Sequence, residues 1–165
     1  MKIIISRIQF TLLILFSIFS TVDTLGQSGR KDFVFNWNIS KDNMWIPIDT
    51  SLKRFNPTPA EVQLAKELSK KYLDSLQLIT NNDPQVDTLG SASYNHENYT
   101  RQYLGYIDNN GNKIIFINAC CSELAEGINL ERHWLYSMED NPCYFQVKVN
   151  LKAMTCFGLN GNKDE

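Results

Sequence analysis

The sequence predicts an α+β fold in which one N-terminal amphipathic helix packs on an antiparallel meander of four to five strands. Three observations lead to this fold: a capped amphipathic segment after residue 57, a hairpin signal around residue 110, and an alternating apolar run after residue 142. A helix laid across such a sheet is also the layout of cystatin-like proteins and of cone-shaped α+β proteins, and the pattern is compatible with both.

The helix is predicted from Pro59 to about Leu76. Thr58 is placed to cap the first free N–H groups, Pro59 fits the first helical position, and Glu61 completes a capping box with Thr58. Apolar residues recur at steps of three and four and form one stripe: Val62, Ala65, Leu68, Tyr72, Leu73 and Leu76. This stripe needs a sheet to cover it.

The second half of the chain supplies the strands. Residues 99–107 and 113–121 flank an Asn- and Gly-rich turn, which is a strong hairpin signal. Trp134, Tyr136 and Met138 alternate with polar or smaller neighbours, and 143–151 has a clear period of two. A last short strand is predicted from Ala153 to Leu159.

Residues 27–57 form an N-terminal arm or an extra strand before the main domain. Phe33, Phe35 and Trp37 alternate, and 44–48 is apolar, so both segments are predicted to be strands or an ordered arm along the sheet. The alternative is a loosely attached extension, which three large aromatic residues in five positions disfavour.

The N-terminal 26 residues have the layout of a signal peptide. Lys2 and Arg7 precede an apolar run, Ile8–Phe19, and cleavage is expected before Gln27. The apolar run is shorter than the roughly 20 residues of a membrane-spanning helix, so no stable membrane insertion is expected after cleavage. The predicted domains are therefore the signal peptide 1–26, the arm 27–57, the helix-and-sheet domain 58–161 and a tail, 162–165.

The charge and the motif content of the sequence limit the classes of partner that the protein is expected to bind. The formal net charge is −2 and no basic stripe is present, so nucleic acid is not expected as a partner. The four cysteines form no C-x2-C pair, and His96 and His133 lack ligand spacing, so no metal or other cofactor is expected. An unknown protein or a small ligand remains as the partner.

Three runs resemble small exported bacterial proteins with no assigned activity: residues 99–107, 114–121 and 143–151, with the closing Leu159-Asn160-Gly161. The resemblance covers roughly residues 58–161 and implies the same fold and a periplasmic, surface or secreted location in a bacterium. In those relatives one cysteine ends the second strand and another opens the later strand. These positions match Cys121 and Cys143, so the resemblance implies a disulfide between them.

Strand alternation limits the cysteine pairings. Cys120 and Cys121 point to opposite faces of a regular strand, so only one of them can meet Cys143. A bridge from Cys121 to Cys143 closes a loop of about 22 residues and adds about 3 kcal/mol of stability by chain-entropy reasoning. Cys156 then either pairs with Cys120 or stays buried as a small apolar residue.

Aromatic residues give the candidate ligand site. If the second face of the sheet is open, Tyr106, Trp134 and Tyr144 line a groove for a peptide, glycan or lipid. The alternative is that residues 33–57 cover this face and the rings are ordinary core, which is the more frequent outcome because exposed aromatic patches are rare.

The sequence gives less support to a catalytic site than to a binding site. A thiolate at Cys120 or Cys121 with His96 or His133 as base has no supporting motif. Glu123 and Glu126, a close pair on a predicted turn, are typical of a solvated surface. No catalytic residue is assigned.

The sequence therefore favours a non-enzymatic binding or interaction module of the bacterial envelope or secretome. One alternative is a small hydrolase-like or ligand-transforming enzyme with a pocket on the curved sheet face. Another is a subunit of a surface assembly, which would present an exposed apolar strip or an unpaired edge strand, for example over Ala153–Leu159.

Overall fold

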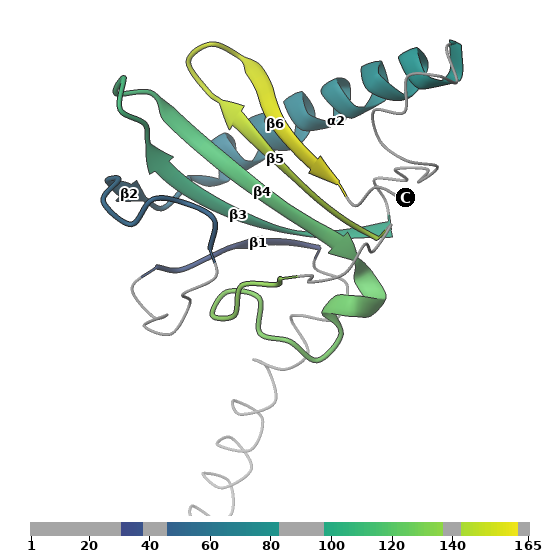
Figure 1. The fold of residues 1–165 in the computed structure, drawn as a ribbon. Helices are drawn as coiled ribbons and strands as arrows, with labels where there is room; N and C mark the ends of the chain where they lie inside the picture. The colour runs from purple at the N-terminus through teal and green to yellow at the C-terminus, as the bar shows by residue number, and fades with distance from the viewer. Residues whose placement is uncertain (1–30, 38–45, 83–97, 137–142, 162–165) are drawn as a thin grey trace, which may run out of the picture. The chain divides into compact units, whose positions relative to one another are not determined.

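A computed structural model describes residues 31–37, 46–82, 98–136 and 143–161, which all belong to one structural unit. These residues form a six-stranded sheet with one long helix across one face (Figure 1). The predicted signal peptide, 1–26, and the predicted tail, 162–165, lie outside the described residues. The predicted α+β class is confirmed.

Four strands form the predicted antiparallel meander, in the order β3 (Tyr99–Ile107), β4 (Lys113–Cys121), β5 (Tyr144–Asn150) and β6 (Thr155–Gly161). Tyr103 lies opposite Ile117, which lies opposite Val147. Side chains therefore alternate between the face under the helix, called here the helix face, and the opposite face, called the second face.

The sheet is mixed, so the prediction of a purely antiparallel sheet is wrong. β1 (Asp32–Val34) runs parallel to β3, and β2 (Arg54–Phe55) pairs antiparallel with the far end of β3. Both short strands pair with the outer edge of β3, whose backbone groups would otherwise be unpaired. A strand was predicted over 134–138, but residues 134–136 are not in a strand. Residues 137 and 138 lie outside the described residues.

The helix, α2, extends from Pro59 to Asn82. Its predicted capping box is present: the Thr58 N–H donates to Glu61 Oε2 at 2.9 Å, and the Glu61 N–H donates to Thr58 Oγ1 at 3.3 Å. Lys113 also hydrogen-bonds to Glu61 and is the main cause of its lowered pKa. The helix follows β1 and β2, so the prediction that it is the N-terminal element is wrong.

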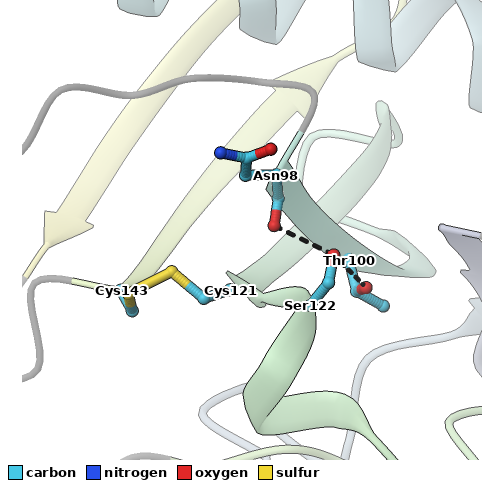
Figure 2. The surroundings of a disulfide bond; sticks show 5 residues. All are labelled: Asn98, Thr100, Cys121, Ser122 and Cys143. Atoms are coloured by element: carbon cyan, nitrogen blue, oxygen red, sulfur yellow. Dashed lines mark hydrogen bonds between the residues drawn. A yellow bond between two sulfur atoms is a disulfide. The ribbon is translucent and has the colours of Figure 1, made fainter.

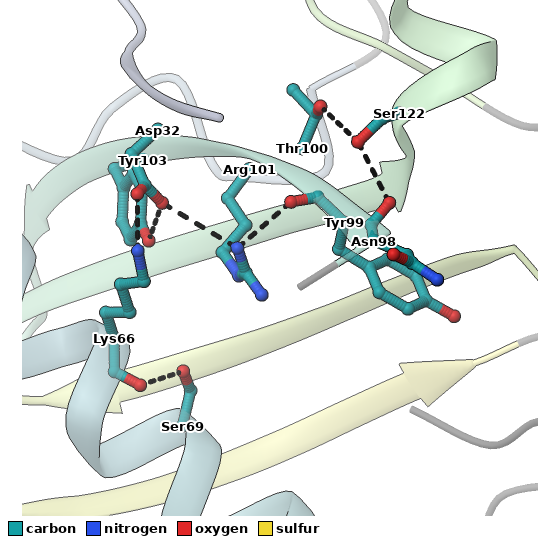
Figure 3. Close-up of polar contacts among 9 residues, drawn as sticks. All are labelled: Asp32, Lys66, Ser69, Asn98, Tyr99, Thr100, Arg101, Tyr103 and Ser122. Carbon is teal, nitrogen blue, oxygen red and sulfur yellow. Dashed lines mark hydrogen bonds and ion pairs between the residues drawn. The ribbon is translucent and has the colours of Figure 1, made fainter. Parts of the chain in front are cut away.

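The helix face holds the first core, which α2 covers along its apolar stripe. A polar cluster joins three elements at its margin (Figure 3). Asp32 of β1 accepts hydrogen bonds from Lys66 Nζ of α2 at 2.5 Å and from the Tyr103 hydroxyl of β3 at 2.7 Å. The guanidinium of Arg101, only 3% exposed, lies 3.9 Å from the same carboxylate. These contacts tie the arm to the helix and the sheet.

The disulfide between Cys121 and Cys143 is confirmed (Figure 2). It joins the end of β4 to the start of β5, where the Cys121 N–H also donates to the Cys143 carbonyl at 2.9 Å. Cys120 is buried on the second face, whereas Cys156 packs against the core of the helix face, so the sheet separates these two free thiols. Burial raises the pKa of each thiol to about 11.

Among the described residues, no helix combines the length and the apolar character that crossing a membrane requires.

Replacing both bridged cysteines, Cys121→Ser with Cys143→Ser, is expected to lower the free energy of unfolding by about 3 kcal/mol, because the unfolded chain regains the entropy of an open loop. Urea unfolding followed by circular dichroism measures the change. Cys156→Ala, which removes a half-buried free thiol, should cost less than about 1 kcal/mol. Equal losses in the two variants would contradict a specific role for the bridge.

Candidate functional site

The second face of the sheet is covered by the arm and by the loop that follows β4. Two clusters of buried residues lie there: one contains Phe35, Ile46, Leu104, Tyr106, Ile114, Phe116 and Trp134, and the other contains Phe33, Cys120, Ala125, Leu130 and Tyr144. Most apolar residues in the described part of 33–57 therefore pack on this face, as the alternative interpretation of the sequence predicts, whereas Phe55 packs against the core of the helix face.

The three predicted groove residues are buried here. Tyr106, Trp134 and Tyr144 are 7%, 8% and 6% exposed. Tyr106 and Trp134 belong to the cluster around Phe35, whereas Tyr144 belongs to the cluster around Phe33. The structure thus places Tyr106 and Trp134 in one cluster and Tyr144 in another. A role of these three residues in ligand binding stays a prediction.

A buried amide side chain holds the loop that carries Trp134. Gln102 Nε2 donates to the carbonyl oxygens of Leu130 at 2.8 Å and His133 at 2.7 Å. Gln102 Oε1 accepts the N–H of Leu135 at 2.9 Å. Because two of these bonds lie on either side of Trp134 in the chain, Gln102 fixes the backbone from which the indole projects.

Two further amide side chains, those of Asn118 and Gln146, continue the hydrogen bonding of Gln102 across β4 and β5. Asn118 Nδ2 donates to Gln102 Oε1 at 3.0 Å and to the Leu135 carbonyl at 2.8 Å. Gln146 Nε2 donates to Asn118 Oδ1 at 3.2 Å and also to the Tyr144 hydroxyl. The buried polar groups of the second face are thus connected from β3 to β5, which makes the position of the loop specific.

Four aromatic rings form a continuous chain of ring contacts on the second face. Phe35 makes edge-to-face contacts with Trp37 and Trp134, with ring centroids 5.7 and 5.4 Å apart. Trp134 in turn stacks on Phe116, with centroids 5.6 Å apart. The guanidinium carbon of Arg54 lies 3.4 Å from the centroid of the Trp37 ring, at one end of this chain of rings.

This group of side chains contains hydrogen-bond donors that have no acceptor among the described residues. Trp37 Nε1, Trp134 Nε1 and Arg54 Nε are buried and have no hydrogen-bond partner among the described residues. Indole and guanidinium groups can only donate, and an unpaired buried donor costs about 1–3 kcal/mol. Burial also lowers the pKa of the Arg54 guanidinium. These three residues, Trp37, Arg54 and Trp134, are called here the donor cluster.

A separate pocket of about 380 Å³ lies at the disulfide, lined by Lys31, Asn98, Cys121, Ser122, Glu123 and Cys143. Its hydroxyl is already engaged: Ser122 Oγ donates to the Asn98 carbonyl at 2.9 Å and accepts from Thr100 at 3.2 Å (Figure 2). This pocket contains no buried donor or acceptor that lacks a partner among the described residues. The donor cluster is therefore the better candidate site.

Among the described residues, those considered for catalysis are not assembled into a site. Cys121 is in the disulfide, and burial keeps the Cys120 thiol protonated by raising its pKa. Glu123 lies in the short 3-10 helix Ser122–Ala125, called η2, and Glu126 directly follows it; both side chains are exposed. His96 lies outside the described residues, and within the described ranges no three metal-ligating side chains cluster.

Sequence analysis missed Arg54 as a site residue. Its strand, β2, has two residues, which is too short to show a period. The stacking on Trp37 depends on the pairing of β2 with β3, because Arg54 lies opposite Tyr106. No local pattern around Arg54 indicates this contact.

Comparison with known proteins gives no match: no protein-family model, no curated protein and no solved structure matches the chain.

Gln102→Leu is expected to lower the free energy of unfolding by about 3 kcal/mol, because backbone groups of the loop would lose their buried partner. The emission of Trp134 should shift to longer wavelength as the loop loosens. Gln63→Leu, at an exposed position of α2, is the control and should change stability by less than about 0.5 kcal/mol. Unfolding titrations and fluorescence spectra measure both effects; an unchanged spectrum in Gln102→Leu would show that Gln102 does not position the indole.

Proposed function

We propose that this protein is an exported, non-enzymatic binding module that takes a carboxylate-bearing ligand at the donor cluster. The observation that carries the proposal is the presence of three buried donors, in Trp37, Arg54 and Trp134, with no acceptor among the described residues. An acceptor supplied by a ligand would recover the free energy that these donors lose on burial.

The charge and shape of the donors favour a carboxylate. A guanidinium is a planar fork that matches two carboxylate oxygens, and its hydrogen bonds to an anion are stronger than those to a neutral acceptor. The ion pairs of the described residues do not include Arg54. Trp37 and Trp134 add indole N–H groups and flat apolar surface, which suits an acidic side chain or an acidic sugar.

Titratable side chains of the second face support binding rather than catalysis. Burial raises the pKa of Tyr106, of Tyr144 and of the Cys120 thiol. These groups are therefore neutral near pH 7 and serve poorly as general bases. A binding module needs the donors of this face, whereas the hydrolase alternative needs a base beside them.

Export is part of the proposal, and two features support it. The N-terminal 26 residues have the layout of a signal peptide. The Cys121–Cys143 disulfide is of a kind that forms and persists in oxidising compartments outside the cytoplasm.

Titration of the purified protein with N-acetylglutamate and, separately, with glucuronate is expected to change tryptophan emission saturably, because Trp37 and Trp134 lie at the site. Arg54→Gln should weaken the response at least about tenfold, or about 1.4 kcal/mol. Arg132→Gln, which removes the same charge from an exposed loop position, is the matched control and should leave it unchanged. Binding should also fall below about pH 4, where the carboxylic acids of the probes become protonated.

Three outcomes would contradict carboxylate binding: no saturable response to either probe, an Arg54→Gln variant that binds like the unaltered protein, or tighter binding of inorganic phosphate. A response to only one probe would identify the source of the carboxylate, a peptide or a sugar. Circular dichroism of each variant shows whether the fold is retained.

A further inference from the structure

The disulfide between Cys121 and Cys143 forms part of the wall of a pocket. That pocket, of about 380 Å³, is lined by both cysteines, and each of them is half-buried. Exchange of a disulfide requires a thiolate to contact one of its two sulfur atoms, so an exposed bond is exchanged more readily than one inside a core. The Cys121–Cys143 bond is therefore placed for reaction with a thiol.

The rest of the pocket wall is polar. Lys31, Asn98 and Glu123 line it and are exposed, and Ser122 lies between the disulfide and Asn98 in hydrogen-bonding terms, because its hydroxyl donates to the Asn98 carbonyl (Figure 2). A volume of about 380 Å³ is within the range of pockets that hold a small molecule. A polar thiol of low molecular mass therefore fits beside the bond.

The free thiols of the chain do not reach this disulfide. Cys120 is buried on the second face, opposite to the face of its neighbour Cys121 in the same strand. Cys156 lies opposite Val149, which is about 20 Å from Cys143 along an extended strand. Within one folded chain no thiol is available for exchange, so the attacking thiolate has to come from another molecule.

We infer that this pocket is a thiol-exchange site, at which an external thiolate forms a mixed disulfide with one of the two bridged cysteines. The thiolate attacks one sulfur and forms a new S–S bond with it. The electron pair of the broken bond leaves on the other sulfur, which then takes a proton from water. The step needs no other oxidant or reductant.

Strand pairing makes the exchange reversible. The Cys121 N–H donates to the Cys143 carbonyl at 2.9 Å, and beside this bond Cys120 of β4 lies opposite Tyr144 of β5. These backbone contacts do not require the S–S bond, so the released thiolate stays next to the mixed disulfide. A neighbouring thiolate has a high effective concentration, and it restores the bridge by expelling the external thiol once that thiol is withdrawn.

The test uses the oxidised protein, purified from cells that express the whole sequence, without denaturant. It is incubated at about pH 8 with millimolar reduced glutathione and, separately, with a dithiol oxidoreductase of the thioredoxin type. Mass spectrometry after acid quenching measures the loss of the bridge and the mixed disulfide. The rate is expected to be independent of urea below the unfolding transition, because the folded protein reacts.

A matched pair of variants tests whether the thiolate enters through the pocket. Asn98→Phe, at an exposed lining residue, should slow the reaction at least about threefold, because a ring narrows the access to the sulfur atoms. Asn110→Phe makes the same change at an exposed residue of the turn between β3 and β4, at the far end of these strands, and should react as the unaltered protein does.

Reaction with glutathione would identify a small thiol as sufficient, whereas reaction with the oxidoreductase alone would identify a protein thiol as the source. Removal of glutathione should restore the bridge. The inference is overturned if neither thiol reacts with the folded protein, or if the rate rises with urea as steeply as global unfolding does. Equal rates in Asn98→Phe and Asn110→Phe would also overturn it.

Discussion

Gln102 hydrogen-bonds to the backbone on both sides of Trp134, and the arrangement of the second face depends on this contact. The central strands place Gln102, Asn118 and Gln146 side by side at buried positions. Buried amides are stable only when their hydrogen-bonding groups are paired, so this face needs a covering segment that supplies carbonyl oxygens and an N–H group. The loop after β4 supplies them, and the indole of Trp134 is positioned as a consequence.

β3 connects this arrangement to the donor cluster. Its outer edge pairs with β1 near Arg101 and with β2 near Tyr106, so one strand sets the positions of both halves of the arm. Phe35 and Trp37 follow β1 directly, and Arg54 belongs to β2. The Asp32 carboxylate then anchors β1 to α2 through Lys66, which means that the arm contacts the layers on both sides of the sheet. A shift in the pairing of β3 would therefore separate Arg54 from the Trp37 ring.

Local patterns in the sequence predict the meander and the start of α2, because hairpin turns, strand alternation and the Thr58 capping box act between neighbouring residues. The sequence prediction ends the helix at about Leu76, whereas α2 continues to Asn82. β1 was not assigned as a parallel strand, since three residues carry no reliable period and its partner is distant in sequence. The donor cluster was missed in part for the same reason: Arg54 acquires its environment only through tertiary contacts.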